Sequence, residues 1–123
     1  MGLSTDVLRV DDIVIVAASG HFSTDEGTLF QNTVKRYLDD GVRHVILNLR
    51  DVFYIDSSGL GELITTYMTL RKIEGQVVLV NPSKMVKDLL EITKLSTVFP
   101  IFDEESDAVA SLQISDGRNA IIG

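Results

Sequence analysis

The chain has 123 residues, of which 45% are hydrophobic and 24% are charged, as expected for one globular domain. It carries 11 Lys and Arg against 18 Asp and Glu, and this net charge of −7 predicts that nucleic acid is not a partner. The absence of cysteine excludes disulfides, thiolate nucleophiles and cysteine-ligated metals. No apolar run approaches the roughly 20 residues that span a bilayer, and the first residues do not resemble a signal peptide. We therefore expect a cytoplasmic protein without a membrane partner.

The first half of the chain alternates between strand and helix patterns. Residues 7–10, the polar pair Asp11-Asp12 and the apolar run 13–18 predict a hairpin that leads into a buried strand. After Gly20, the segment Ser23-Thr24-Asp25-Glu26 has the spacing of a capping box. The helix that it would begin has apolar residues at helical spacing and is expected to end at Gly41; these residues are Phe30, Val34, Tyr37 and Leu38.

The middle of the chain continues the alternation. The apolar run 45–49 predicts a second buried strand, and residues 52–55 carry the chain to the next turn. Residues 60–68 then predict a helix that ends near Gly75 and turns one apolar stripe toward the core. That stripe consists of Leu60, Leu63, Ile64, Tyr67 and Met68.

The last third of the chain predicts two strands and two helices. Residues 77–80 form a strand, and Asn81-Pro82-Ser83 form a turn and a cap for a helix. That third helix carries the apolar stripe Val86, Leu89 and Leu90. Residues 98–102 contain Pro100 and suit only an edge strand. A last helix is expected over 103–114, with Ala108, Val109 and Leu112 inward.

These elements define an α/β domain over residues 1–114, with 115–123 as a flexible C-terminal tail. We expect a mixed, mostly parallel sheet of four to five strands covered by about four helices. In such folds the functional loops gather at the carboxyl ends of the strands. The loops 20–24, 56–59 and 81–83 are therefore expected to meet.

The segment Asp56-Ser57-Ser58-Gly59-Leu60 lies where a buried strand passes into an amphipathic helix. It places two hydroxyl groups at a helix N-terminus, with a carboxylate directly before them. Unpaired backbone N–H groups and the helix dipole favour negative charge at this position. The segment therefore indicates a phosphate switch.

Residues 42–49 followed by 52–61 resemble the central strand and signature turn of STAS domains. The segments 75–80, 86–93 and 98–102 follow in the order of that family. Within it the chain most resembles the bacterial anti-sigma factor antagonists. The resemblance implies that Ser57 accepts phosphate, with Ser58 as the second choice.

The resemblance also implies a partner-switching cycle without catalysis by this chain. The unphosphorylated protein would bind an anti-sigma factor that is also a serine kinase, and the sigma factor would be released. Phosphorylation of Ser57 would abolish binding, and a serine phosphatase of the metal-dependent type would reverse it. No cofactor or metal is expected, and the protein would be a monomer or weak dimer. The partner-binding residues would be Asp56, Ser57, Ser58, Gly59, Leu60, Gly20, Ser23 and Asp25.

One position departs from the pattern of the family. Antagonists commonly place an acidic residue in a G-x-[LF]-D segment after the second strand. Here Gly20-His21-Phe22-Ser23 ends in serine, and Asp25 follows two residues later. This departure concerns recognition of the kinase and leaves the phosphoacceptor assignment intact.

Several alternatives remain open at this point. Ser57 and Ser58 could simply cap their helix, and Asp56 could be a cap or could orient the acceptor. His21 and His44 are expected at the surface without a catalytic role. A STAS domain could instead act as a scaffold or a transport accessory. A response-regulator receiver with phosphate on Asp56, or a hydrolase with a serine nucleophile, fits the spacing poorly.

Overall fold

The structure is a computed structural model that describes residues 3–22 and 24–115; for residues 24–29 and 115 it describes the backbone alone. Strands and helices alternate along most of the chain, after an N-terminal hairpin. The elements are β1 (Leu3–Val10), β2 (Ile13–Phe22), α1 (Thr24–Asp39), β3 (His44–Ile55), α2 (Ser57–Arg71), β4 (Val77–Val80), α3 (Lys84–Ile92), the 3₁₀ turn η1 (Leu95–Thr97), β5 (Ile101–Phe102) and α4 (Glu105–Ser115).

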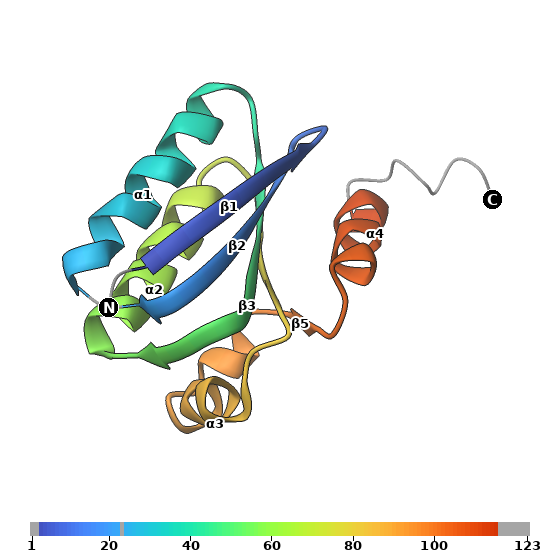
Figure 1. Cartoon of the computed structure of the whole chain (residues 1–123). Helices are drawn as coiled ribbons and strands as arrows, with labels where there is room; N and C mark the ends of the chain where they lie inside the picture. The colour runs from blue at the N-terminus through green and yellow to red at the C-terminus, as the bar shows by residue number, and fades with distance from the viewer. Residues whose placement is uncertain (1–2, 23, 116–123) are drawn as a thin grey trace.

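The five strands form one sheet in the order β1-β2-β3-β4-β5 (Figure 1). β1 is antiparallel to β2, whereas the pairs from β2 to β5 are all parallel. The side chains of α1, α2 and α3 join one hydrophobic cluster, and those of α4 join a second cluster on the opposite face of the sheet. The α/β class, the mixed sheet and the four helices expected from the sequence are confirmed.

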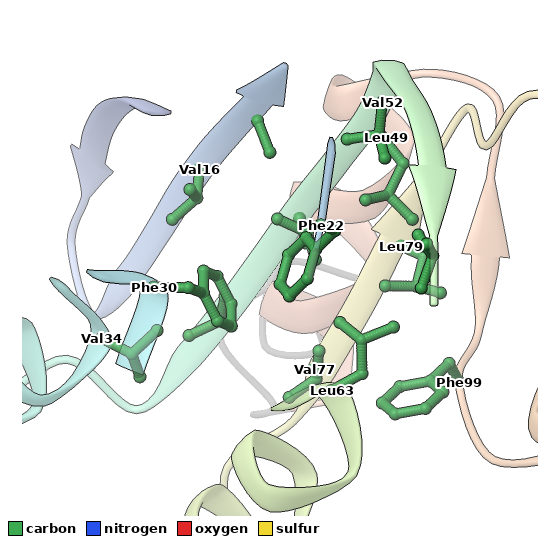
Figure 2. Close-up of a cluster of buried hydrophobic side chains, with 14 of the residues drawn as sticks. Val16, Phe22, Phe30, Val34, Leu49, Val52, Leu63, Val77, Leu79 and Phe99 are labelled. Carbon is green, nitrogen blue, oxygen red and sulfur yellow. The ribbon is translucent and has the colours of Figure 1, made fainter. Parts of the chain in front are cut away.

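The core forms because the central strands are apolar on both faces. Such continuous apolar runs are typical of strands that helices cover on both sides. The larger cluster lies between the sheet and helices α1 to α3, and Figure 2 shows part of it. Phe22 at the end of β2 and Phe30 of α1 meet edge to face with ring centroids 5.2 Å apart, which joins that helix to the strand before it.

β3 is one continuous strand, where the sequence predicted two separate pieces. Its pairing with β2 shifts register between Ala17 and Ser19 and again between Gly20 and His21. Each shift accommodates an extra residue on β3, so its buried side chains Leu49, Val52 and Ile55 are three residues apart instead of two. β4 pairs with β3 only up to Asn48, so the end of β3 extends beyond β4.

Two expectations about side chains are wrong. The fully buried residues of α2 are Gly59, Leu63, Thr66 and Leu70, and Leu60 and Tyr67 pack partly buried against the same core cluster. Ile64 and Met68 are 38% and 57% exposed, so this part of the expected stripe is wrong.

The other wrong expectation concerns His44, which is buried rather than at the surface. Its Nδ1 accepts a hydrogen bond from the backbone N–H of Gln76, at 3.0 Å. This bond ties the start of β3 to the segment that enters β4. His44 is therefore part of the packed interior.

The expectations for the last strand and the last helix held with changes of boundary. β5 is the predicted edge strand but has two residues only, and the chain before it forms η1. α4 runs to Ser115 and turns Ala108 and Leu112 inward, as predicted. The expected capping side chain of Ser23 and the tail beyond residue 115 lie outside the described residues. Within the described part of the chain, no helix has the length and apolar character that a membrane crossing requires.

Candidate functional site

The turn between β3 and α2 is held by Asp56, which is the N-cap of the helix. Its backbone is extended, with φ −99° and ψ −176°, and its carboxylate Oδ1 accepts a hydrogen bond from the Gly59 N–H at 2.9 Å. The same oxygen accepts a second bond from the Ser58 hydroxyl at 2.6 Å. Asp56 therefore satisfies one of the N–H groups that a helix start leaves unpaired.

These hydrogen bonds also stabilise the negative charge of the turn. The Ser58 hydroxyl, and after it the Gly59 N–H, hold the pKa of Asp56 below its ordinary value, because both stabilise the carboxylate form. Asp56 is therefore ionised at neutral pH. A negative charge stands beside Ser57 before any phosphate is added.

Ser57 lies outside this network. It is the first residue of α2 and is exposed, and its hydroxyl makes no hydrogen bond within the described residues. The cap that the sequence left open between three residues is thus Asp56, with Ser58 supporting it. The Ser57 hydroxyl remains accessible to a second protein.

The turn also packs tightly against the end of β2. A Cβ atom on Gly59 would collide with the backbone carbonyl of Phe22, so α2 can begin this close to β2 only with glycine. The Asp56 N–H also points at that carbonyl, at 3.4 Å. Gly59 is buried and supports the turn from inside, whereas a Cβ on Gly61 would meet open space.

A groove of about 740 Å³ opens beside Ser57, between the end of β3 and α3. Figure 1 shows α3 beside the part of β3 that leads into α2. The groove is mainly apolar, and both of its charged residues are aspartates. Its lining residues are Tyr54, Ile55, Asp56, Ser57, Leu60, Met85, Val86, Asp88, Leu89, Ile92 and Thr93.

The other residues predicted to bind the partner do not line this groove among the described residues. Gly20 has a φ of +106° and pairs with Val52 inside the sheet. Asp25 lies in the first turn of α1, where only the backbone is described, and Ser23 lies outside the described residues.

The third predicted loop does not line this groove, because β4 ends long before β3 does. Asn81 lines a separate polar pocket of about 350 Å³ with Asn48 and Arg50 and the start of α4. Ser83 caps α3, as its Oγ accepts from the Val86 N–H at 3.4 Å. The expected meeting of three loops is therefore wrong for the segment 81–83.

Helix α3, and not the loop 81–83, lines the groove beside Ser57. The sequence analysis did not assign α3 to the site. Val86 and Leu90 are the buried residues of α3. Met85 and Ile92 lie outside this buried pair and are 51% and 77% exposed. The sequence did contain a signal for this role of α3, because this short amphipathic helix carries apolar residues on a second side as well.

The described side chains around Ser57 are not arranged as a nucleophile with a neighbouring base. No histidine donates to or accepts from the Ser57 hydroxyl in the part of the chain that the structure describes. The same part of the chain holds no group of three or more His, Asp or Glu side chains that could bind a metal ion. What the geometry offers is an accessible hydroxyl on a rigid turn beside an apolar groove.

The five-stranded sheet, its helical cover and the turn at Ser57 define a small α/β domain with an exposed serine and an apolar groove at one end of β3. The chain belongs to the STAS domain family, whose model matches residues 4–108. It is 30% identical over 105 residues to a candidate anti-sigma factor antagonist of Thermotoga neapolitana, covering 85% of this chain and 93% of that protein. It is 26% identical over 119 residues to an anti-sigma F factor antagonist of Paenibacillus polymyxa, covering 93% and 98%.

A solved structure supports the same family. The crystal structure of a candidate anti-sigma factor antagonist from Thermotoga maritima superposes with a TM-score of 0.82 at 28% sequence identity. The likeness covers 89% of this chain and 94% of that one. The relatives named here therefore match the domain over nearly all of their own length.

Proposed function

We propose that this protein is an anti-sigma factor antagonist that acts by partner switching in the cytoplasm. The unphosphorylated form binds an anti-sigma factor that is also a serine kinase, and this binding releases the sigma factor. Phosphorylation of Ser57 abolishes the binding. The observation that carries the proposal is the exposed Ser57 hydroxyl, outside the bonds that hold its turn and on the rim of an apolar groove.

In the chemical step the Ser57 Oγ attacks the γ-phosphorus of ATP in the kinase. The bond from Oγ to phosphorus forms, the bond to the bridging oxygen of ADP breaks, and the hydroxyl proton leaves to a base of the kinase. A metal-dependent serine phosphatase returns the hydroxyl by hydrolysis. This chain supplies the acceptor only and catalyses neither step.

The phosphate adds roughly 1.5 to 2 negative charges beside Asp56. In the free domain the N-terminus of α2 stabilises this charge by about 0.3–1 kcal/mol, and by up to ~2 kcal/mol in a partly buried site. In a docked complex the same charge loses its water, and an unpaired charge in an interface typically costs about 2–5 kcal/mol. Affinity should therefore fall by tens- to thousands-fold, while the fold persists.

The test incubates the purified protein with ATP and each anti-sigma factor kinase encoded in the same genome, and maps phosphate by mass spectrometry. Wild type and Ser58→Ala should gain one phosphate on Ser57, and Ser57→Ala should gain none. Ser57→Ala should bind the kinase, whereas phosphorylated wild type should not. Phosphate on Ser58 alone, or equal affinity of the two forms, would contradict the mechanism. A protein that no such kinase binds would instead fit a scaffold or a transport accessory.

A further inference from the structure

We infer that the groove between the Ser57 turn and α3 receives an apolar side chain of the anti-sigma factor kinase, and that Asp88 pairs with a basic side chain next to it. This inference rests on the proposed function. It adds α3 as the second half of the docking surface, which the sequence motif at Ser57 does not contain.

Several apolar side chains beside the groove are not buried in the core. Met85 and Ile92 are largely exposed, and they line the same groove as the half-buried Leu60 and Leu89. Single exposed apolar residues are ordinary on a protein surface. Several that adjoin one groove are typical of a recognition site, because water leaves all of them when a partner docks.

The charged residues of the groove specify the chemistry of the side chains that it can receive. Among the described residues that line the groove, Asp56 and Asp88 carry charge, and no lysine or arginine does. The Asp56 carboxylate is already engaged by its own turn. Asp88 is free to change partner, because its bond to Lys84 at 3.1 Å joins two exposed side chains four residues apart on the helix.

Such exposed pairs contribute little to stability, so a cation of the partner can replace Lys84 without a large loss. An apolar residue flanked by Arg or Lys therefore complements this groove, and one flanked by Asp or Glu is repelled. Asp88 would act as a specificity-determining residue that separates the cognate kinase from others.

The position of Ser57 connects the groove to the switch. Its hydroxyl lies on the rim of the same groove, so a phosphate would stand where the apolar side chain enters. Docking would then have to remove water from a dianion at the edge of an apolar cavity.

The experiment measures affinity for the kinase that phosphorylates Ser57, by titration calorimetry with unphosphorylated variants. Ile92→Ser removes an apolar wall of the groove, and Ile114→Ser is the control, since Ile114 is 60% exposed on α4 at the opposite face of the sheet. Asp88→Lys reverses the charge, and Glu91→Lys is the control on an exposed position of the same helix outside the groove. Asp88→Glu tests for rescue.

We expect both groove variants to bind at least about tenfold more weakly, while both controls and Asp88→Glu stay within about twofold. Thermal unfolding identifies any variant that fails to fold. If wild type binds and is phosphorylated but the groove variants match their controls, the inference is overturned and the proposed function stands. If no such kinase binds wild type, both are overturned.

Discussion

Gly59 and Gly61 lie two residues apart in α2, and the structure gives them opposite roles. A Cβ on Gly59 would collide with the carbonyl of Phe22, whereas a Cβ on Gly61 would meet no atom within 4 Å apart from its chain neighbours and its own helix backbone. Gly59→Ala and Gly61→Ala therefore introduce the same methyl group into the same helix with different surroundings. We expect the first to destabilise the protein and the second to stabilise it.

The magnitudes follow from two opposing effects. Replacing glycine by alanine inside a helix contributes about 0.5–1 kcal/mol of stability at either position. Overpacking at Gly59 costs about 1–3 kcal/mol, and the upper end applies because the obstacle is a backbone carbonyl that cannot rotate away. The net expectation is a loss of about 2 kcal/mol for Gly59→Ala and a gain of about 0.5–1 kcal/mol for Gly61→Ala.

Urea denaturation followed by circular dichroism measures both free energies of unfolding. The two variants should differ by about 3 kcal/mol, which for a domain of this size corresponds to roughly 10 °C in Tm. Equal stability of the two variants would refute the close approach of α2 to β2. A loss in Gly61→Ala as large as in Gly59→Ala would refute the open position of Gly61.

Three further predictions concern hydrogen bonds. Ser58→Ala should raise the pKa of Asp56 toward its ordinary value near 3.8, and Ser57→Ala should not, as carbon-detected NMR titration would show. Because folding lowers the pKa of Asp56, its contribution to stability is complete above about pH 4 and is lost as the pH falls through the folded value. The stability gap between wild type and Asp56→Asn should therefore shrink in acid; a gap that widens below pH 4 would contradict this sign. His44→Leu should cost about 1–3 kcal/mol in urea denaturation, because the Gln76 N–H loses its acceptor, and a change below about 0.5 kcal/mol would show that the bond is dispensable.

The order of the elements could be read from the sequence because each element has a strong local signal. The runs 13–18, 45–49 and 77–80 are apolar on both faces, which few structures other than a covered parallel sheet can accommodate. The turn at Ser57 could be predicted because it interrupts such a strand just before a helical pattern. Local signals of this kind do not depend on the rest of the fold.

The errors occur where tertiary packing overrides the local pattern. α2 turns Gly59 toward the Phe22 carbonyl of β2 and Thr66 toward Gln31 of α1, and Met68 is exposed although it looks like a core residue. The bulges of β3 depend on its pairing with β2, which no single segment encodes. The contribution of α3 to the groove follows from the length of β3 beyond β4, and that length was not predicted.

The hydrogen bonds of the turn explain how one modification could change binding without changing the fold. Ser58 and Gly59 both donate to Asp56, and Gly59 is packed on Phe22, so among the described residues the turn is held without a hydrogen bond from the Ser57 hydroxyl. A phosphate on Ser57 would leave each of these bonds in place and would change only charge and bulk at the rim of the groove. The helix N-terminus offsets the charge in the free domain, whereas the described residues that line the groove offer it two carboxylates and no lysine or arginine. Under the proposed function, the phosphate therefore penalises the complex more than the free protein, and a rigid domain is sufficient for the switch.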